Sequence, residues 1–592
     1  MNSNRALSLD EIQQLERQGC TADSWNSVTV GDNFSPLNIT EVHFSGQVRL
    51  GSYDETTDVG DGLRRQAGIH RSTLCNVTVG NNTLIEGVGQ YIANTDIGDD
   101  CYISHVGRMV TTGETTFGQL DRIAVLNEGG DGNVVKYPGL TAQMAAFMVR
   151  YAGDEAVMDQ LSAAISRRVR LRMPARTTIG KGCKVIGTAI VQNAWLADGC
   201  YVDSATRISD STLAADSYVG NDVIIESSIV AGSASVVDGA KVYNCFVGEA
   251  CHIGKGASAE ASIFFANSYL DNGEACAAFW GPFTVSHHKS TLLIGGQYSF
   301  YNAGSGTNFS NHAYKVGPIH WGVMQRGAKT ASGSHILWPA TIGAFTMCMG
   351  KISNHPTTAD LPFSYLFGQP DGTTAIVPGR NLATVGTYRD VNKWPKRDKR
   401  PQDCRQSLVS CEWLSPLTVG ACIRGERLLA HWQAGQPVGG CTLNERAAIR
   451  GRECYDMAIR MFMGAMTERH GAEAPAVPYP GDEWADLAGL LVPEKQVKRL
   501  AEELRQGEVD VEARFRELAA DYEAYAWSWA YNQILDYYDM ERLTEADAAR
   551  IAEDGSEARS QWLTAIRLDA EKEYQMGDME LDELNNFLNK LQ

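Results

Sequence analysis

Aliphatic residues recur every seventeen positions along the middle of the chain, between Ile179 and Ala275. Two columns of this repeat are regular: Ile179, Leu196, Leu213, Val230, Val247 and Phe264 form the first, and Val185, Val202, Val219, Val236, Ile253 and Leu270 follow six residues later. A third, looser column contains Val191, Ile208, Ile225, Val242, Ala259 and Cys276. A fixed period of this length predicts a solenoid, in which each repeat is one coil and the aliphatic side chains stack inside.

The spacing inside each repeat is six, six and five residues, so each coil should contain three short strands joined by turns. The residue four positions after the first column is always small: Cys183, Cys200, Ser217, Ala234, Cys251 and Ser268. We expect this small residue where the wall turns, because a larger side chain there would clash with its close-packed neighbours.

The hexads IGKGCK, LADGCY, VGNDVI, VGEACH and IGKGAS resemble those of the hexapeptide-repeat superfamily, whose fold is a left-handed parallel β-helix. The resemblance implies a mainly β solenoid and, because the flat faces of such helices pack around a threefold axis, a homotrimer. Most members of that superfamily are acyltransferases that use acyl-coenzyme A or acyl carrier protein. Others are metal-dependent carbonic anhydrases, appendages of nucleotidylyltransferases or assembly proteins, so the fold alone does not select the chemistry.

The remaining segments have other patterns. We expect a capping helix within residues 1–24, a first β-helical section over 25–138, a helical insertion over 139–174, the main β-helix over 175–392 and an α-helical domain over 393–592. Ser8 and Glu11 have the spacing of a capping box at a helix start. Thr544 and Asp547 repeat that spacing, and Gly555 is the expected end of their helix.

Charge and composition exclude several classes of partner. The net charge of −19 argues against nucleic acid or an anionic membrane as the main partner. No apolar stretch of about 18 residues and no N-terminal signal pattern is present, so we expect no membrane span and a cytoplasmic location. The 14 cysteines include no CxxC pair, so we expect reduced thiols and no bound metal.

Histidines concentrate where the repeat loses its regularity. Six of the 12 are His287, His288, His312, His320, His335 and His355. Polar departures from a regular solenoid indicate a site. The His-Pro pair at His355, followed by a polar loop, is similar to the catalytic-histidine segment of the sugar O-acetyltransferases, which implies His355 as the base, with His312 as the second candidate. The expected substrate-binding residues are Asn308, Asn311, His320, Trp321, His335 and Asn354.

These observations predict an acyltransferase-like enzyme that moves an acyl group from acyl-coenzyme A or acyl carrier protein to a hydroxyl or amine of a sugar or nucleotide-sugar. A positioned histidine base contributes about 10²–10⁴ in rate, and Asn311 or Asn354 could assist. The basic linker 393–400 could contact the phosphates of coenzyme A, although we expect it mainly as a solvated run of charge.

Two other classes remain as alternatives. One is a non-catalytic scaffold, or a protein that binds a carbohydrate or nucleotide-sugar. The other, a metal-dependent hydratase, is less favoured because no H-x4-H pair is present. We expect no nucleotidyl transfer, because only a short helix precedes the hexads.

Overall fold

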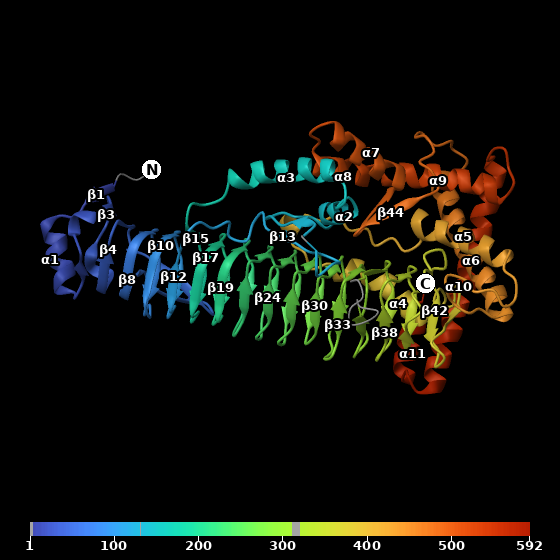
Figure 1. The fold of residues 1–592 in the computed structure, drawn as a ribbon, viewed down its shortest axis with the longest axis horizontal. Helices are drawn as coiled ribbons and strands as arrows, with labels where there is room; N and C mark the ends of the chain where they lie inside the picture. Colours follow the sequence, from blue (N-terminus) through green and yellow to red (C-terminus); the bar gives the residue numbers. More distant parts are fainter. Residues whose placement is uncertain (1–3, 131, 311–319, 592) are drawn as a thin grey trace.

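The aliphatic columns stack in register inside a parallel β-solenoid of about 19 turns (Figure 1). The structure is a computed structural model that describes residues 4–130, 132–310 and 320–591. Ile179 lies opposite Leu196, and the pairing continues coil by coil to Phe264. The second column pairs in the same way from Val185 to Leu270. The predicted mainly β solenoid with additional helices is therefore confirmed.

The third column departs from the prediction at its last member. Ala259 lies opposite Ala275, not Cys276. Ala275 is fully buried, whereas Cys276 is only partly buried. The physical reason is the turn of Asn272 and Gly273 between β29 and β30, which is one residue shorter than the turn of residues 255–257 in the preceding coil and shifts the following strand by one position. A shift of one residue in a strand moves each side chain to the opposite side of the wall.

The coils form three flat faces. The first face contains β9 (Leu84–Glu86), β11 (Tyr102–Ser104), β16 (Lys184–Ile186), β18 (Tyr201–Asp203), β20 (Tyr218–Val219), β23 (Ser235–Val236), β26 (His252–Gly254), β29 (Tyr269–Asp271), β32 (Val285–Ser286), β37 (Lys329–Thr330), β40 (Met347–Met349) and β42 (Tyr365–Gly368). Single-residue bridges at Asn302 join β32 to β37, so this face is one continuous ladder.

The second face contains β12 (Arg108–Val110), β21 (Ile224–Glu226), β24 (Lys241–Tyr243), β27 (Ser258–Glu260), β30 (Glu274–Cys276), β33 (Leu292–Ile294), β35 (Asn308–Ser310), β38 (His335–Leu337) and β41 (Lys351–Ile352). The third face contains β15 (Thr177–Ile179), β22 (Ile229–Val230), β25 (Phe246–Val247), β28 (Ile263–Phe264), β31 (Phe279–Trp280), β34 (Gly296–Tyr298), β36 (Gly322–Met324) and β39 (Thr341–Ile342). Longer strands bend from one face to the next, among them β8 (Gly68–Val79), β10 (Tyr91–Ile97), β17 (Ile190–Leu196) and β19 (Arg207–Leu213).

The N-terminal end carries a helix and a projecting hairpin. Helix α1 (Leu9–Arg17) begins with the predicted capping box, in which Ser8 and Glu11 exchange hydrogen bonds. The first coils contain β1 (Asn4–Ala6), β2 (Thr21–Ala22), β3 (Val28–Gly31), β4 (Ile39–Ser45) and β5 (Val48–Leu50). An antiparallel hairpin, β6 (Thr56–Gly60) and β7 (Leu63–Gln66), then reaches the first face, where Asp58 pairs with Lys184 at 2.8 Å.

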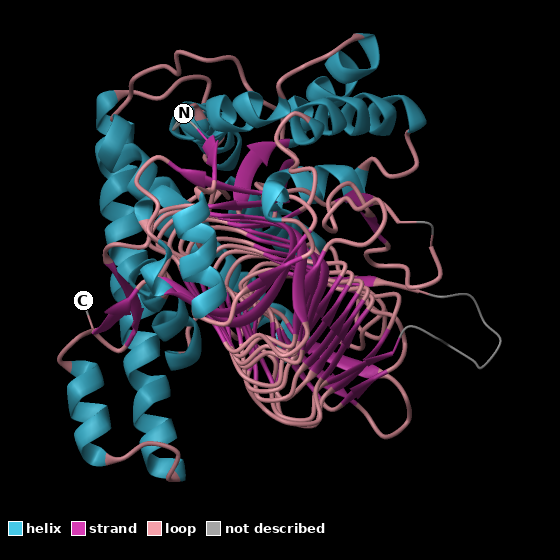
Figure 2. Ribbon diagram, turned by 90° about the vertical axis from the view of Figure 1, so that its left-hand side faces the viewer, coloured by secondary structure: helices cyan, strands magenta, loops and turns pink. Residues whose placement is uncertain are grey.

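The third face is covered by an insertion and by the C-terminal region. The insertion contains β13 (Arg122–Ile123), β14 (Val134–Val135), α2 (Ala142–Arg150) and α3 (Glu155–Arg170). Outward-facing Ile229, Phe246, Ile263 and Phe279 are buried in one hydrophobic core with these elements and with residues 485–518. The helices therefore surround only part of the solenoid, as the view along its axis shows (Figure 2).

The C-terminal region begins with α4 (Val385–Lys393) after β43 (Thr374–Val377). It continues with α5 (Pro416–Ala430), α6 (Glu445–His470), the hairpin β44 (Trp484–Leu487) and β45 (Leu490–Pro493), α7 (Glu494–Gln506), α8 (Val511–Ala520), α9 (Tyr522–Tyr537), α10 (Glu545–Met576) and α11 (Leu581–Leu588). The capping box of Thr544 and Asp547 is confirmed at the start of α10.

Gly555 does not end this helix, so that prediction is wrong. Helix α10 continues through Gly555 to Met576. A Cβ added to Gly555 would lie 2.5 Å from the Cα of Gly464 on α6. The glycine therefore permits a close crossing of the two helices, a tertiary requirement that local spacing does not reveal.

Candidate functional site

A groove of about 980 Å³ lies on the first face of the solenoid, where α4 and the segment after it cross the coils. Its floor is formed by side chains that follow one another along the ladder: Ser235, His252, Tyr269, Val285, Asn302 and Lys329. Each of these residues comes from a separate coil. Neighbouring strands lie about 4.8 Å apart, so the floor extends for roughly 24 Å.

Helix α4 forms part of the groove wall and is held by the C-terminal helices. Its first backbone N–H, at Val385, donates to Asp569 of α10 at 3.0 Å, and the same carboxyl group pairs with Arg380. Tyr388 packs against Trp562 of α10 and Phe587 of α11. The opposite side of α4 presents its charged residues to the groove.

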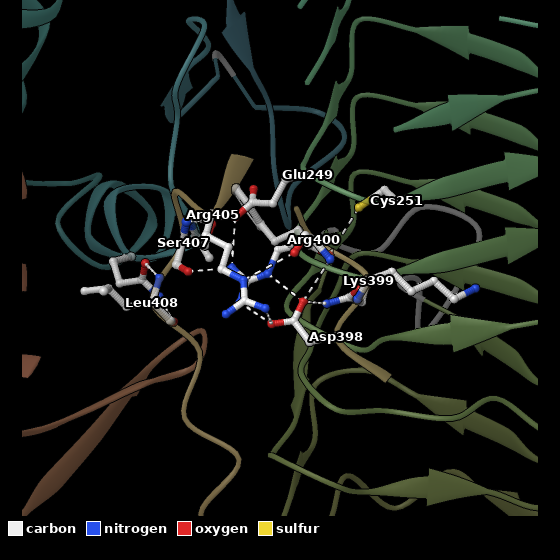
Figure 3. A network of polar contacts seen from close by, with 12 residues as sticks. Glu249, Cys251, Asp398, Lys399, Arg400, Arg405, Ser407 and Leu408 are labelled. Atoms are coloured by element: carbon white, nitrogen blue, oxygen red, sulfur yellow. Dashed lines mark hydrogen bonds and ion pairs between the residues drawn. The ribbon is translucent and has the colours of Figure 1, made fainter. Parts of the chain in front are cut away.

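Residues 394–408, called the strap, run beside the solenoid coils (Figure 3). The first part of the strap continues the groove wall with Trp394, Arg397 and Lys399. Asp398 accepts a hydrogen bond from the Asn267 side chain at 2.9 Å, and the backbone N–H of Lys399 donates to Asn267 Oδ1 at 2.8 Å. Arg400 donates to Glu249 at 3.2 Å and forms a bidentate pair with Asp398, with both distances 2.9 Å. Burial opposes ionisation of Asp398, but the Arg400 hydrogen bonds outweigh it and lower the pKa of that carboxyl group.

The strap is therefore not simply a solvated run of charge. Lys396, Arg397 and Lys399 are exposed, as expected, but Arg400 is buried between the strap and the solenoid. The prediction is wrong for Arg400 because a salt-bridge partner, Glu249, comes from a coil about 150 residues earlier in the chain. A buried guanidinium is stable only when such partners satisfy it.

The groove concentrates positive charge. Five cationic side chains line it, and Asp390 is the single carboxylate among the lining residues; the cations are Lys329, Arg389, Lys393, Arg397 and Lys399. Asp390 contacts the ammonium groups of both Lys329 and Lys393. Arg389, Arg397 and Lys399 form no ion pair with any residue in the described part of the chain.

Burial lowers the pKa of two of these cations. It lowers the pKa of Lys393 to about 8, and the charges of Arg389 and Arg397 act in the same direction. It also lowers the pKa of Lys329 to about 7, while contact with the Asp390 carboxylate favours its ammonium form. The like charges of Lys393 and its neighbours Arg389 and Arg397 repel one another. A bound anion would reduce this repulsion, so the groove favours an anionic ligand.

His252 lies in the middle of the groove floor, where Nδ1 is hydrogen-bonded and Nε2 is within ion-pair distance of a carboxylate. Its Nδ1 is 2.8 Å from Ser235 Oγ, and its Nε2 is 3.4 Å from Asp271 Oδ1. Asp271 is 1% exposed and also pairs with Lys255 at 2.7 Å. The ring stacks on Tyr269 at 4.3 Å. Burial lowers the pKa of His252, although the Asp271 charge opposes the change, so the neutral imidazole is favoured at neutral pH.

His287, one of the six clustered histidines, lines the groove. The described residues among the predicted catalytic and substrate-binding set lie outside it. Asn308 and His335 are paired on the second face, where His335 Nε2 contacts Ser310 Oγ at 2.8 Å. Burial lowers the pKa of His335, and the charge of Lys351 adds to the effect. His320 and Trp321 precede β36, and Trp321 is 48% exposed.

The remaining predicted residues lie towards the C-terminal region or outside the described part of the chain. Asn354 donates to the carbonyl of Gly440 at 2.6 Å and accepts from Thr374. His355 is exposed, and its Nδ1 lies 3.1 Å from the carbonyl oxygen of Pro339. Asn311 and His312 fall within residues 311–319, outside the described residues. The structure therefore pairs Asn308 with His335 and places neither His355 nor Asn354 in the groove.

Sequence reasoning did not find His252, Tyr269 or Lys329 as site residues. A signal was available for the first two, because Ser235, His252 and Tyr269 each precede a member of the second aliphatic column by one position. Successive residues of a strand point to opposite sides. Because the aliphatic column faces inward, Ser235, His252 and Tyr269 face outward. No local pattern indicates that α4 returns over this outward row of side chains.

No group of three or more His, Cys, Asp or Glu side chains is arranged to hold a metal ion within residues 4–130, 132–310 and 320–591. Across the same ranges, no helix is both long and apolar enough to cross a bilayer.

Comparison with known proteins places the groove and strap inside one matched region. Residues 4–433 match the family described as "Domain of unknown function (DUF4954)", and residues 475–580 match "Domain of unknown function (DUF6819)". A protein of Treponema pallidum (strain Nichols), described as an uncharacterized protein, is 24% identical over 457 residues. That similarity covers 70% of this chain and 60% of the relative, so the chain spans about 60% of the relative's length. Because the first match covers most of its residues, the chain belongs to the DUF4954 family.

Proposed function

We propose that the groove binds the phosphate-bearing part of a small molecule, either an acyl-coenzyme A or a nucleotide-sugar. One observation carries this proposal: five cations converge with one carboxylate on a chain whose net charge is −19. Such a local excess attracts phosphate, and charge-assisted hydrogen bonds from Lys and Arg hold it. The rings of His252 and Tyr269 add flat surfaces for a base or sugar.

Binding is tested on the full chain by calorimetry and thermal unfolding with acetyl-coenzyme A, UDP-N-acetylglucosamine and inorganic pyrophosphate. A ligand of the folded state raises the unfolding temperature. Lys393→Ala should weaken binding about tenfold, whereas Lys396→Ala is a matched control, because Lys396 is exposed on the strap and does not line the groove. Absence of binding by all three phosphate compounds would refute the proposal. Of the two ligand classes, the one that binds more tightly identifies the source of the phosphate.

A second candidate function is transfer of the acyl group to a sugar hydroxyl, with His252 as the base. The observation that favours it is the hydrogen bond between His252 Nδ1 and the Ser235 hydroxyl, with Asp271 at the other ring nitrogen. This arrangement orients a neutral imidazole towards a hydroxyl in the groove, as general base catalysis requires. In this step the Ser235 side chain turns away and a hydroxyl of the sugar replaces it as the partner of His252 Nδ1. His252 takes the hydroxyl proton as the oxygen bonds to the thioester carbonyl carbon; the C–S bond then breaks, and the leaving thiolate receives that proton.

Thioester consumption in the presence of a panel of sugars tests this step. His252→Ala should reduce turnover by about 10²–10⁴, while His355→Ala should leave it unchanged. The reverse result would return the role of base to His355. Acyl-coenzyme A binding without turnover would favour the non-catalytic binding protein. A homotrimeric state and a cytoplasmic location remain predictions.

A further inference from the structure

The outward ladder that forms the groove floor continues beyond the groove. Ser235 pairs with Tyr218, and Tyr218 pairs with Tyr201 on the next coil. The two tyrosine rings lie 5.4 Å apart, and Tyr218 is 38% exposed. From Tyr201 to His252 the ladder advances by three strand spacings, roughly 14 Å. An aromatic surface therefore leads directly to the histidine.

The charge changes sign along this ladder. Asp203 lies two residues after Tyr201 on β18, so both side chains point to the same, outward side of the wall. Burial and then the charge of Asp203 raise the pKa of both Tyr201 and Tyr218. The charge of Asp238 acts on Tyr218 in the same way. Lys184 lies over the Tyr201 ring but is neutralised by Asp58. The surface around the tyrosines is thus acidic, in contrast with the cationic groove.

The β6–β7 hairpin bounds the far end of this surface. The Tyr201 hydroxyl lies 4.0 Å from the position that a Cβ on Gly60 would take, and the ion pair of Asp58 with Lys184 ties the hairpin to the first face. The tyrosine surface is therefore limited at one end by the hairpin and opens into the groove at the other.

We infer that the Tyr201–Tyr218 surface binds a neutral oligosaccharide whose terminal sugar reaches His252. Tyrosine rings offer apolar faces on which sugar rings pack, together with hydroxyl groups that hydrogen-bond. The carboxylates of Asp203 and Asp238 accept hydrogen bonds from sugar hydroxyls. The same carboxylates repel nucleic acid and acidic glycans from the tyrosine surface. The cationic groove alone would not repel these anionic ligands.

This inference deepens the proposed function, because it makes the acceptor a sugar chain and places it on a separate part of the ladder from the phosphate-bearing ligand. The two proposals fail separately, since oligosaccharide binding is measured without any phosphate compound. Lys396→Ala, at an exposed residue outside both the groove and the tyrosine surface, should leave oligosaccharide binding unchanged.

The test uses the full chain and an array of neutral oligosaccharides, including cellohexaose, maltohexaose, chitohexaose and mannohexaose, with calorimetry on any that bind. Affinity should rise with chain length from disaccharide to hexasaccharide. Tyr218→Ala and Tyr201→Ala should each weaken binding at least tenfold. Tyr91→Ala is the matched control, since Tyr91 is a comparably exposed tyrosine on the second face, and it should bind as the parent does.

Thermal unfolding of each variant accompanies the measurement. If the alanine variants do not fold, Asp203→Asn and Asp238→Asn replace them. These variants should weaken binding by a smaller factor, because the side-chain oxygen that accepts a hydrogen bond from the sugar stays and only its negative charge is lost. Failure of the parent to bind any neutral oligosaccharide, binding of acidic glycans only, or unchanged affinity in Tyr218→Ala would each overturn the inference.

Discussion

Replacing Glu249 with alanine should release the strap from the solenoid. Glu249 Oε1 accepts a hydrogen bond from Arg400 at 3.2 Å and another from the backbone N–H of Ser407 at 2.7 Å. Its side chain is 2% exposed and that of Arg400 is 5% exposed. Glu249→Ala therefore removes the carboxylate acceptor and leaves two buried donors, the Arg400 guanidinium and the Ser407 backbone N–H, without it.

The magnitude follows from these contacts. Each hydrogen bond to a charged group contributes roughly 1.5–3 kcal/mol. Complete loss of the partner of a buried charge costs about 3–5 kcal/mol. Arg400 keeps its bidentate pair with Asp398, so we expect a cost at the lower end of this range. We expect the free energy for opening the strap to fall by about 3 kcal/mol, which corresponds to roughly a 100-fold rise in the open population. Glu249→Gln keeps an acceptor oxygen and should cost only about 1 kcal/mol.

Hydrogen exchange measures this opening directly. The amides of Lys399 and Leu408 donate to Asn267 and Gln143, not to Glu249, so they report release of the whole strap and not the lost contact itself. Both should exchange roughly 100-fold faster in Glu249→Ala. Asp403→Ala is the control, because Asp403 is an exposed strap residue with the same charge. If only Ser407 exchanges faster while Lys399 and Leu408 do not, the network does not hold the strap as one unit.

Three other predictions follow from the same structure. Affinity for acetyl-coenzyme A or UDP-N-acetylglucosamine should fall as pH rises from 7 to 9, because Lys393, whose pKa burial lowers to about 8, loses its charge in this range; calorimetry at both pH values checks this, and Lys393→Ala should flatten the dependence. Gly555→Ala should destabilise the C-terminal helices by about 1–3 kcal/mol, because its Cβ would meet the Gly464 backbone at 2.5 Å; urea unfolding checks this against Gly507→Ala, where nothing lies within 4 Å. Ile253→Ala should cost about 2–5 kcal/mol, since this fully buried side chain stacks between Val236 and Leu270; a change below 1 kcal/mol in the same unfolding assay would contradict the stacked core.

The sequence by itself determined the architecture of the coils. Inward side chains of a solenoid contact their counterparts one period away, so a constant spacing such as that of Val219, Val236 and Ile253 is enough to predict which residues stack. The capping boxes of Ser8 and Thr544 were equally predictable, because both partners of each box lie within one helical turn.

Only the tertiary structure decided where a site could form. The groove combines His252 and Lys329 of the solenoid with Arg397 of the strap. No local pattern indicates that the chain returns over coils that it formed 145 and 68 residues earlier. Gly555 is another case, because its role is set by Gly464 on a neighbouring helix. Short-range periodicity fixes contacts between successive coils, whereas contacts between distant segments depend on how complete surfaces fit together, and a single sequence does not display that fit.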